Sequence, residues 1–190
     1  MPRRPATRAG SARDTLASLD ALAPGTERRV RARIPAASLE IIDQTSRMGW
    51  VPIEHDKWIP WAIVEELGEA QASEYFRRFF AKHRNAPILR TVIDGAIRVF
   101  GLSPNSVLRV APRTWDLVFR DHCTIEWSRQ GDSAARVVLR DAAPELLEWP
   151  SYALAFRAFF YGILDIASAE GEVTQAVDLE AASITYELRW

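Results

Sequence analysis

The sequence predicts an α+β protein, in which an N-terminal helical half is followed by a four-stranded antiparallel sheet interrupted by one long helix. Apolar residues recur at helical spacing through about the first 120 residues. Beyond residue 121 apolar and polar residues alternate instead, which is typical of half-buried strands. Strands that follow a run of helices favour an antiparallel sheet packed beside those helices.

The helical half is expected to span about residues 36–120. Gly68 and Gly101 each follow a stretch of helical periodicity, as glycines at helix ends do. Pro112 is expected to break or bend the last helix, because proline removes a backbone donor. The expected helices cover residues 36–46, 56–67, 69–83, 86–101 and 104–120.

The sheet half is expected to span about residues 121–190 as a hairpin, a long helix and a second hairpin. The turn at residues 131–133 (Gly-Asp-Ser) joins the first two strands, and a turn around residues 180–181 joins the last two. A helix over residues 151–169 separates the hairpins. The last strand alternates most clearly, with these side chains expected to face inward: Ile184, Tyr186, Leu188 and Trp190.

Length and composition place the chain among proteins with one self-sufficient core. A chain of 190 residues buries enough surface to fold without a disulfide or a metal. The single cysteine, Cys123, has no partner within the chain and is expected to be a buried strand residue. No run of ~18 apolar residues is present, and no apolar segment follows the basic N-terminus. We therefore expect a cytoplasmic protein without a membrane span.

Residues 1–13 are expected to form a disordered basic arm ahead of a single domain over residues 14–190. The arm is rich in proline, glycine, alanine and arginine and has almost no large apolar residue. Residues 1–33 carry eight arginines against three acidic residues, a local charge of +5 in a chain of net charge −1. Nucleic-acid contact and a merely solvated tail are the alternatives. The arm lacks aromatic residues that could stack on bases, which argues against nucleic-acid binding.

The long helix predicted after Pro150 is apolar on almost every side, so it is expected to be buried between the sheet and the N-terminal helices. A large apolar pocket between such layers is one interpretation, and plain core packing is the other. Gly162 in the helix interior would permit the close approach of a strand or a ligand. The candidate pocket residues are Phe156, Phe159, Phe160, Tyr161 and Gly162.

Tryptophan is plentiful, with seven residues in the chain. Trp58 and Trp61 lie three residues apart on one expected helix, with Trp50 nearby. They are the candidate docking surface for a protein partner, and buried aromatic packing is the alternative.

Catalytic and metal-binding patterns are weak. No GxSxG, HExxH, P-loop or GxGxxG motif is present. Glu54, His55 and Asp56 are consecutive and fan out, so they are read as a charge patch at a helix N-terminus and not as a metal site. His122 adjoins Cys123, but neighbouring strand residues point to opposite faces. The sequence therefore predicts no catalytic, cofactor-binding or metal-binding residue.

Several short motifs resemble an uncharacterised paralogous family known chiefly from myxobacteria. They are residues 49–52 (Gly-Trp-Val-Pro), Pro112 and Trp115 with the following Phe119-Arg120, the glycine in the long helix, and residues 184–190 (Ile-x-Tyr-x-Leu-x-Trp). That family is distantly similar to the haem nitric-oxide-binding domains, the four-vinyl-reductase domains and the Golgi TRAPP subunits. The similarity covers about residues 36–190.

The resemblance implies a ligand-binding or docking fold but does not carry a haem over. The haem domains use a Tyr-x-Ser-x-Arg signature and a proximal histidine. The terminal strand here has Leu188 and Trp190 where that signature would need serine and arginine. His83 and His122 are the only histidines loosely placed for an axial ligand, and each is expected to be a surface or loop residue.

The expected function is that of a non-enzymatic regulatory module that docks a protein partner or a second copy of itself as a homodimer. An apolar small molecule is a possible ligand of the same module. The alternative is a small-molecule sensor domain without haem, and no cofactor is expected.

Overall fold

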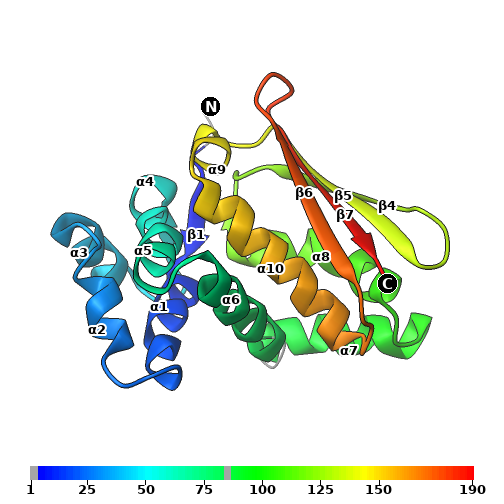
Figure 1. The fold of residues 1–190 in the computed structure, drawn as a ribbon, viewed down its shortest axis with the longest axis horizontal. Coiled ribbons are helices and arrows are strands. Elements are labelled where there is room, and N and C mark those ends of the chain that lie inside the picture. The colour runs from blue at the N-terminus through cyan, green and yellow to red at the C-terminus, as the bar shows by residue number, and fades with distance from the viewer. Residues whose placement is uncertain (1–3, 84–86) are drawn as a thin grey trace.

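The computed structural model describes residues 4–83 and 87–190, apart from the side chains of residues 83 and 87–89. Helices come first and a four-stranded antiparallel sheet follows, so the predicted α+β class is confirmed (Figure 1). The helices of the first half are α1 (Ala9–Ala17), η1 (Ser18–Ala21), α2 (Thr26–Arg31), α3 (Ala36–Gln44), α4 (Ile53–Asp56), α5 (Trp58–Leu67), α6 (Glu69–His83), α7 (Pro87–Phe100) and α8 (Pro104–Val118).

The second half has the predicted order of hairpin, long helix and hairpin. Strands β4 (Thr124–Arg129) and β5 (Ala134–Arg140) form the first hairpin, and β6 (Glu172–Asp178) and β7 (Ser183–Arg189) form the second. Helices α9 (Pro144–Glu148) and α10 (Pro150–Ile166) lie between them in sequence. The strand order is β4-β5-β7-β6, so β7 pairs with strands of both hairpins.

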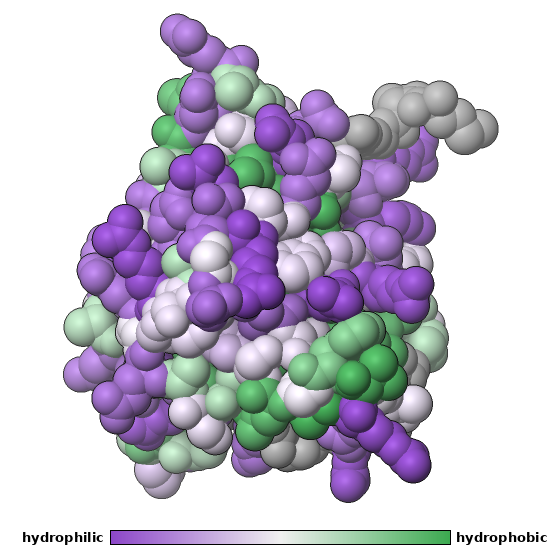
Figure 2. Space-filling model, turned by 90° about the vertical axis from the view of Figure 1, so that its right-hand side faces the viewer, coloured by the Kyte–Doolittle hydropathy of each residue, from purple (hydrophilic) through white to green (hydrophobic). Residues whose placement is uncertain are grey.

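The two faces of this sheet differ sharply in polarity. Tyr186 and Leu188 on β7 are fully buried, as the alternation predicts, while Trp190 is half-buried. On the outer face, Arg136 pairs with Glu187 across β5 and β7 at 2.6 Å. The side of the molecule seen in Figure 2 is largely hydrophilic, and its most extensive hydrophobic patch lies at the lower right.

A second, three-stranded sheet was not predicted from the sequence. Its order is β2-β1-β3, with β1 (Ala6–Arg8) in the centre between β2 (Trp50–Pro52) and β3 (Phe119–Arg120). Both pairings are antiparallel, and Thr7 lies opposite both Val51 and Phe119. Strands β2 and β3, which are distant in the sequence, thus both pair with the N-terminal strand β1.

The prediction of a disordered arm is wrong for residues 4–13, and residues 1–3 lie outside the described part of the chain. Ala6, Ala9 and Ala12 are buried, and the backbone N–H of Ala9 donates to the carbonyl of Gly49 at 3.1 Å. A Cβ added to Gly10 would lie 3.0 Å from the carbonyl oxygen of Arg47. The small residues that suggested disorder instead allow β1 and α1 to approach neighbouring backbone closely.

Several arginines among residues 1–33 donate hydrogen bonds to carbonyl and carboxylate oxygens within the protein. The Arg8 guanidinium donates to the carbonyls of Leu117 and Met48, at 3.2 and 2.5 Å. Arg29 and Arg33 both donate to Glu66, at 2.7 and 2.9 Å. These contacts give the N-terminal excess of arginine a structural role.

Helix α10 lies between two groups of buried apolar side chains. Phe160 packs on Tyr186 of the sheet, with 4.7 Å between ring centroids. Ala158 is buried among side chains of α5 and α6 on the opposite side. A Cβ on Gly162 would lie 3.3 Å from the carbonyl oxygen of Arg77, so this glycine allows close approach of helix α6. The sequence had suggested a strand or a ligand as its neighbour.

Two expectations about the helices need correction. Helix α8 continues through Pro112, so this proline does not break it. The helix expected over residues 56–67 begins at Trp58 as α5, and Asp56 instead ends the short preceding helix α4. Among the described residues, no helix combines the length and apolar character needed to cross a bilayer.

Candidate functional site

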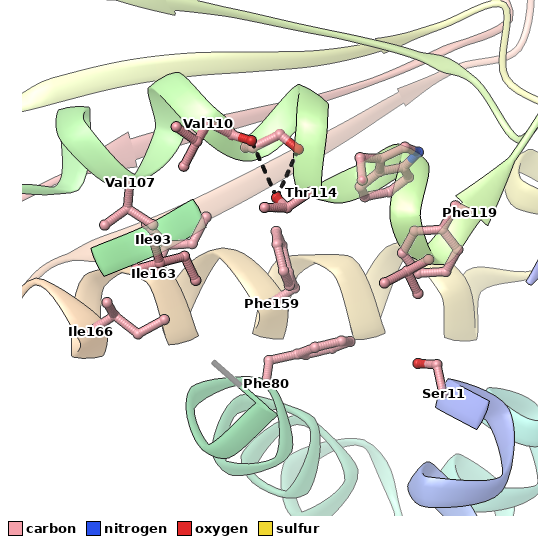
Figure 3. A pocket seen from close by; sticks show the side chains of 13 residues that line it. Ser11, Phe80, Ile93, Val107, Val110, Thr114, Phe119, Phe159, Ile163 and Ile166 are labelled. Atoms are coloured by element: carbon pink, nitrogen blue, oxygen red, sulfur yellow. Dashed lines mark hydrogen bonds between the residues drawn. The ribbon is translucent and has the colours of Figure 1, made fainter. Parts of the chain in front are cut away.

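The candidate site begins with an apolar cavity of about 70 Å³ between α8 and α10. We call it the apolar cavity. Figure 3 shows Phe159 standing between the two helices, with Phe80 from α6 and Ser11 from α1 at one side. Phe159 and Phe80 meet edge to face, with 5.0 Å between ring centroids. A water molecule needs a cavity of roughly 10–15 Å³. The apolar cavity is several times larger, so it has room for a small ligand.

Polar groups in the lining of the apolar cavity are few. The Thr114 hydroxyl donates within its own helix, where the carbonyls of Val110 and Ala111 lie 3.3 and 3.0 Å away (Figure 3). The Trp115 Nε1 is buried without a hydrogen-bond partner among the described residues. The Ser11 side chain points toward the cavity, and none of the described residues forms a hydrogen bond with its hydroxyl. The cavity therefore favours an apolar ligand body.

A second cavity of about 60 Å³ adjoins the first. Ser11, Phe80 and Phe119 line both spaces. The second cavity is also lined by Asp56 and Tyr152, which are polar and do not line the first cavity. We call it the polar cavity.

Asp56 is the centre of a buried group of polar side chains that we call the polar cluster: Thr7, Asp56, His122 and Tyr152. The hydroxyls of Thr7 and Tyr152 donate to Asp56 Oδ2, at 2.7 and 2.8 Å. Only 5% of Asp56 is exposed. Burial raises the pKa of the Asp56 carboxyl, and the two hydrogen bonds only partly oppose this effect. Burial also raises the pKa of Tyr152, as does the nearby Asp56.

His122 completes the polar cluster. It lies in the loop between β3 and β4, as one of the two alternatives expected, but it is fully buried and not at the surface. Its Nε2 lies 3.5 Å from the Thr7 hydroxyl, and its Nδ1 has no partner among the described residues. The ring packs on Phe119, with 5.1 Å between centroids. Burial lowers the pKa of His122 to about 3, against a small opposing effect of Asp121, so the imidazole is neutral at physiological pH.

The sequence placed Asp56 in a charge patch with its two neighbours, and for Asp56 that interpretation is wrong. Glu54 is exposed, and the His55 Nδ1 lies 3.1 Å from the Ser38 hydroxyl. In the described part of the chain, no group of three or more histidine, cysteine or acidic side chains is arranged to hold a metal ion. Cys123 is half-buried and directly precedes β4.

The structure brings two of the five predicted pocket residues to the cavities. Phe159 lines the apolar cavity and Phe156 lines the polar cavity. Phe160 packs against the sheet, and Gly162 packs against α6. Tyr161 is half-buried, and the Arg77 guanidinium lies 5.4 Å from the centre of its ring.

The three predicted docking tryptophans are half-buried and packed against neighbouring side chains. Trp58 meets Trp61 edge to face, with 5.4 Å between ring centroids, and meets Trp149 in the same way at 5.0 Å. Two guanidinium groups lie close to the Trp50 ring, that of Arg8 at 3.7 Å and that of Arg120 at 4.9 Å from the ring centre. Each ring thus has packing partners within the chain.

Several site residues escaped the sequence analysis altogether. Thr7 lay in the segment assigned to the arm, and Ser11 lay there too. Thr7 and His122 are separated by 115 residues in the sequence, so no local pattern joins them. The polar run over residues 54–57, which contains Asp56, was the one available signal, and it did not indicate that Asp56 is buried.

Comparison with known proteins reveals similarity in structure only. No protein-family model and no curated protein sequence matches the chain. An Fe(II) unliganded mutant H-NOX protein from K. algicida matches with a TM-score of 0.68 and 7% identity, covering 96% of this chain and 95% of that one. A Cs H-NOX mutant carrying 4-cyano-L-phenylalanine matches with a TM-score of 0.61 and 10% identity, covering 96% and 95%. The fold is therefore H-NOX-like, as the resemblance implied.

A third similar structure was studied for haem distortion in the H-NOX family, with a TM-score of 0.60 and 10% identity, covering 96% of this chain and 94% of that one. Proteins ligate haem iron through histidine, cysteine, methionine or tyrosine. The described lining of the apolar cavity contains none of these residues, and no lysine or arginine that could bind a propionate. His122 Nε2 faces Thr7 instead, and the side chain of His83 lies outside the described residues. The lining of the apolar cavity therefore does not fit a haem.

Proposed function

We propose that this chain, whose fold is that of the H-NOX domains, is a non-enzymatic regulatory domain that senses a small apolar molecule other than haem. The observation that carries the proposal is the apolar cavity between α8 and α10. Predominantly apolar cavities with a few placed polar groups are the usual form of small-molecule sites.

The position of the cavity supports a regulatory role. Its lining comes from α6, α7, α8 and α10, with Phe119 contributed by β3 and Ser11 by α1. Phe80 belongs to the helical half, while Phe159 lies on the helix that also packs on the sheet. A ligand in the cavity that contacts both rings would favour one arrangement of the two halves by its differential affinity for that arrangement.

Native mass spectrometry of the purified chain, with a visible absorbance spectrum, tests the proposal. A co-purifying small molecule that is lost on denaturation supports it, and a Soret band would overturn the proposal of a ligand other than haem. Ala111→Leu, which adds bulk to a buried residue of the lining, should abolish the bound mass. Ala37→Leu, at an exposed position on α3, is the matched control and should retain it.

Docking of a protein partner, with a second copy of this chain as the first candidate, is the second proposed function. The end of α7 favours it, because Val99 is 71% exposed and Phe100 is 48% exposed. Leu102, which follows, is 52% exposed. Sedimentation of the chain should then show a dimer that Val99→Ser and Phe100→Ser together weaken, and a monomer at high concentration would contradict self-association.

A further inference from the structure

The two cavities form one extended site with a different chemical character at each end. Ser11, Phe80 and Phe119 line both of them, so the spaces are neighbours along the inner side of α10. The end near Ile163 and Val107 is apolar. The other end reaches Asp56.

Asp56 has an unused hydrogen-bonding capacity. Both hydroxyl donors, from Thr7 and Tyr152, bind Oδ2. No described residue donates to Oδ1, although a carboxylate oxygen can accept two hydrogen bonds. A hydrogen-bond donor on a ligand could therefore bind Asp56 Oδ1.

Asp56 also lacks a counter-charge among the described residues. Its contacts there are neutral hydroxyl groups, and no described lysine or arginine forms an ion pair with it. Lys57 is next in sequence, but its ammonium lies 4.7 Å from the centre of the Trp149 ring. A carboxyl group that folding has already removed from water is electrostatically complementary to a cation.

Ser11 supplies a second polar contact where the cavities meet. Its hydroxyl makes no hydrogen bond with a described residue, and its side chain points toward the apolar cavity (Figure 3). A ligand head near Asp56 can donate to this oxygen as well, because a hydroxyl oxygen accepts two hydrogen bonds.

We propose that the extended site binds a small apolar primary amine, with the nitrogen donating to Asp56 Oδ1 and the hydrocarbon body in the apolar cavity. This inference rests on the proposed small-molecule function and adds the chemical class of the ligand. An alcohol of the same shape can donate one hydrogen bond but brings no charge. An apolar molecule without a polar group can fill the apolar cavity but cannot donate a hydrogen bond to Asp56.

Titration calorimetry with phenethylamine, phenethyl alcohol and ethylbenzene tests the proposal on the full chain. The amine should bind at least about tenfold more tightly than ethylbenzene, because hydrogen bonds to charged groups are the stronger ones. Asp56→Asn should weaken amine binding by about tenfold or more and change ethylbenzene binding by less than about twofold. Asparagine keeps an oxygen for Thr7 and Tyr152, and a thermal melt confirms that the variant folds.

Ser11→Ala is a second, milder variant. It should weaken the binding of the amine by roughly threefold to tenfold and leave the affinity for ethylbenzene unchanged. Equal affinity for all three probes would overturn the amine proposal and leave the apolar site standing. Binding of none of them would overturn both. Amine affinity unchanged in Asp56→Asn would also overturn the amine proposal, even if the amine binds tightly.

Discussion

The Thr7 hydroxyl donates to Asp56 Oδ2 across 2.7 Å, and this contact fixes the central strand of the small sheet to the end of helix α4. Both residues are buried. Both side chains are shielded from bulk water, so removing one partner deprives the other of a hydrogen bond inside the protein.

Thr7→Val keeps the shape of the side chain and removes its donor. We expect the free energy of unfolding to fall by about 1–3 kcal/mol, since Asp56 loses one of its two hydroxyl donors. Thr174→Val, at an exposed position on β6, is the matched control and should stay within about 0.5 kcal/mol. Denaturant unfolding measures both, and equal effects would contradict the importance of the contact.

Asp56→Asn should change how stability depends on pH. The pKa of Asp56 is raised in the folded protein, so the folded state holds its proton more tightly than the unfolded state does. This contribution is fully present below the unfolded pKa and is lost as pH rises through the folded value. Relative to Asp56→Asn, the wild type should therefore lose stability with rising pH in this window, which unfolding curves at several pH values will measure.

His122→Gln should remove an opposite dependence at acidic pH. The pKa of His122 is lowered from 6.5 to about 3, so the unfolded state binds the proton first as the pH falls. Wild-type stability is then complete above about pH 6.5 and falls by about 1.4 kcal/mol per pH unit between there and about pH 3. The difference in unfolding free energy between wild type and His122→Gln separates the effect of His122 from that of Asp56. Parallel pH profiles of the two proteins would contradict the prediction.

Gly162→Leu should destabilise the packing of α10 on α6. The added side chain would start 3.3 Å from the carbonyl oxygen of Arg77, and backbone cannot yield as a flexible side chain can. We expect a loss of about 1–3 kcal/mol or more from overpacking. Gly95→Ala on α7, where an added Cβ meets nothing within 4 Å, should instead stabilise by about 1 kcal/mol. Thermal melts distinguish the two signs.

Deletion of residues 1–8 should destabilise the whole helical half, because it removes β1 from the centre of the small sheet together with the buried Thr7. We expect a fall in the melting temperature of more than about 10 °C, since several kcal/mol of pairing and burial are lost at once. Arg4→Ala, at an exposed position, should change it by no more than about 2 °C. A deletion that melts like the full chain would support the disordered arm.

Elements with their own periodicity were predicted well. The alternation ending at Trp190 and the helical stripe before Gly101 are local patterns that burial on one side produces. The strands of the small sheet have only two or three residues each, which is too short for any alternation. Their pairing depends on partners far along the chain.

The candidate site was predicted only in its aromatic part. Phe156 and Phe159 stand out because they lie on a helix that is apolar almost all round. Asp56 and Tyr152 are separated by 96 residues and meet only through the tertiary fold. Gly162 could be identified as unusual from sequence, but its neighbour α6 could not.

The central position of β1 also constrains the order in which the chain can fold during synthesis. Thr7 is synthesised before its partner Phe119, which follows more than 110 residues later. Tyr152 comes later still, so a nascent chain that ends before it carries Asp56 without one of its two hydroxyl donors. Such long-range closures slow folding and leave unpaired strand edges exposed in the interim. A nascent-chain series stalled on either side of residue 152 should therefore show protease resistance of the N-terminal helices arising late, after the sequence that encodes them has long been translated.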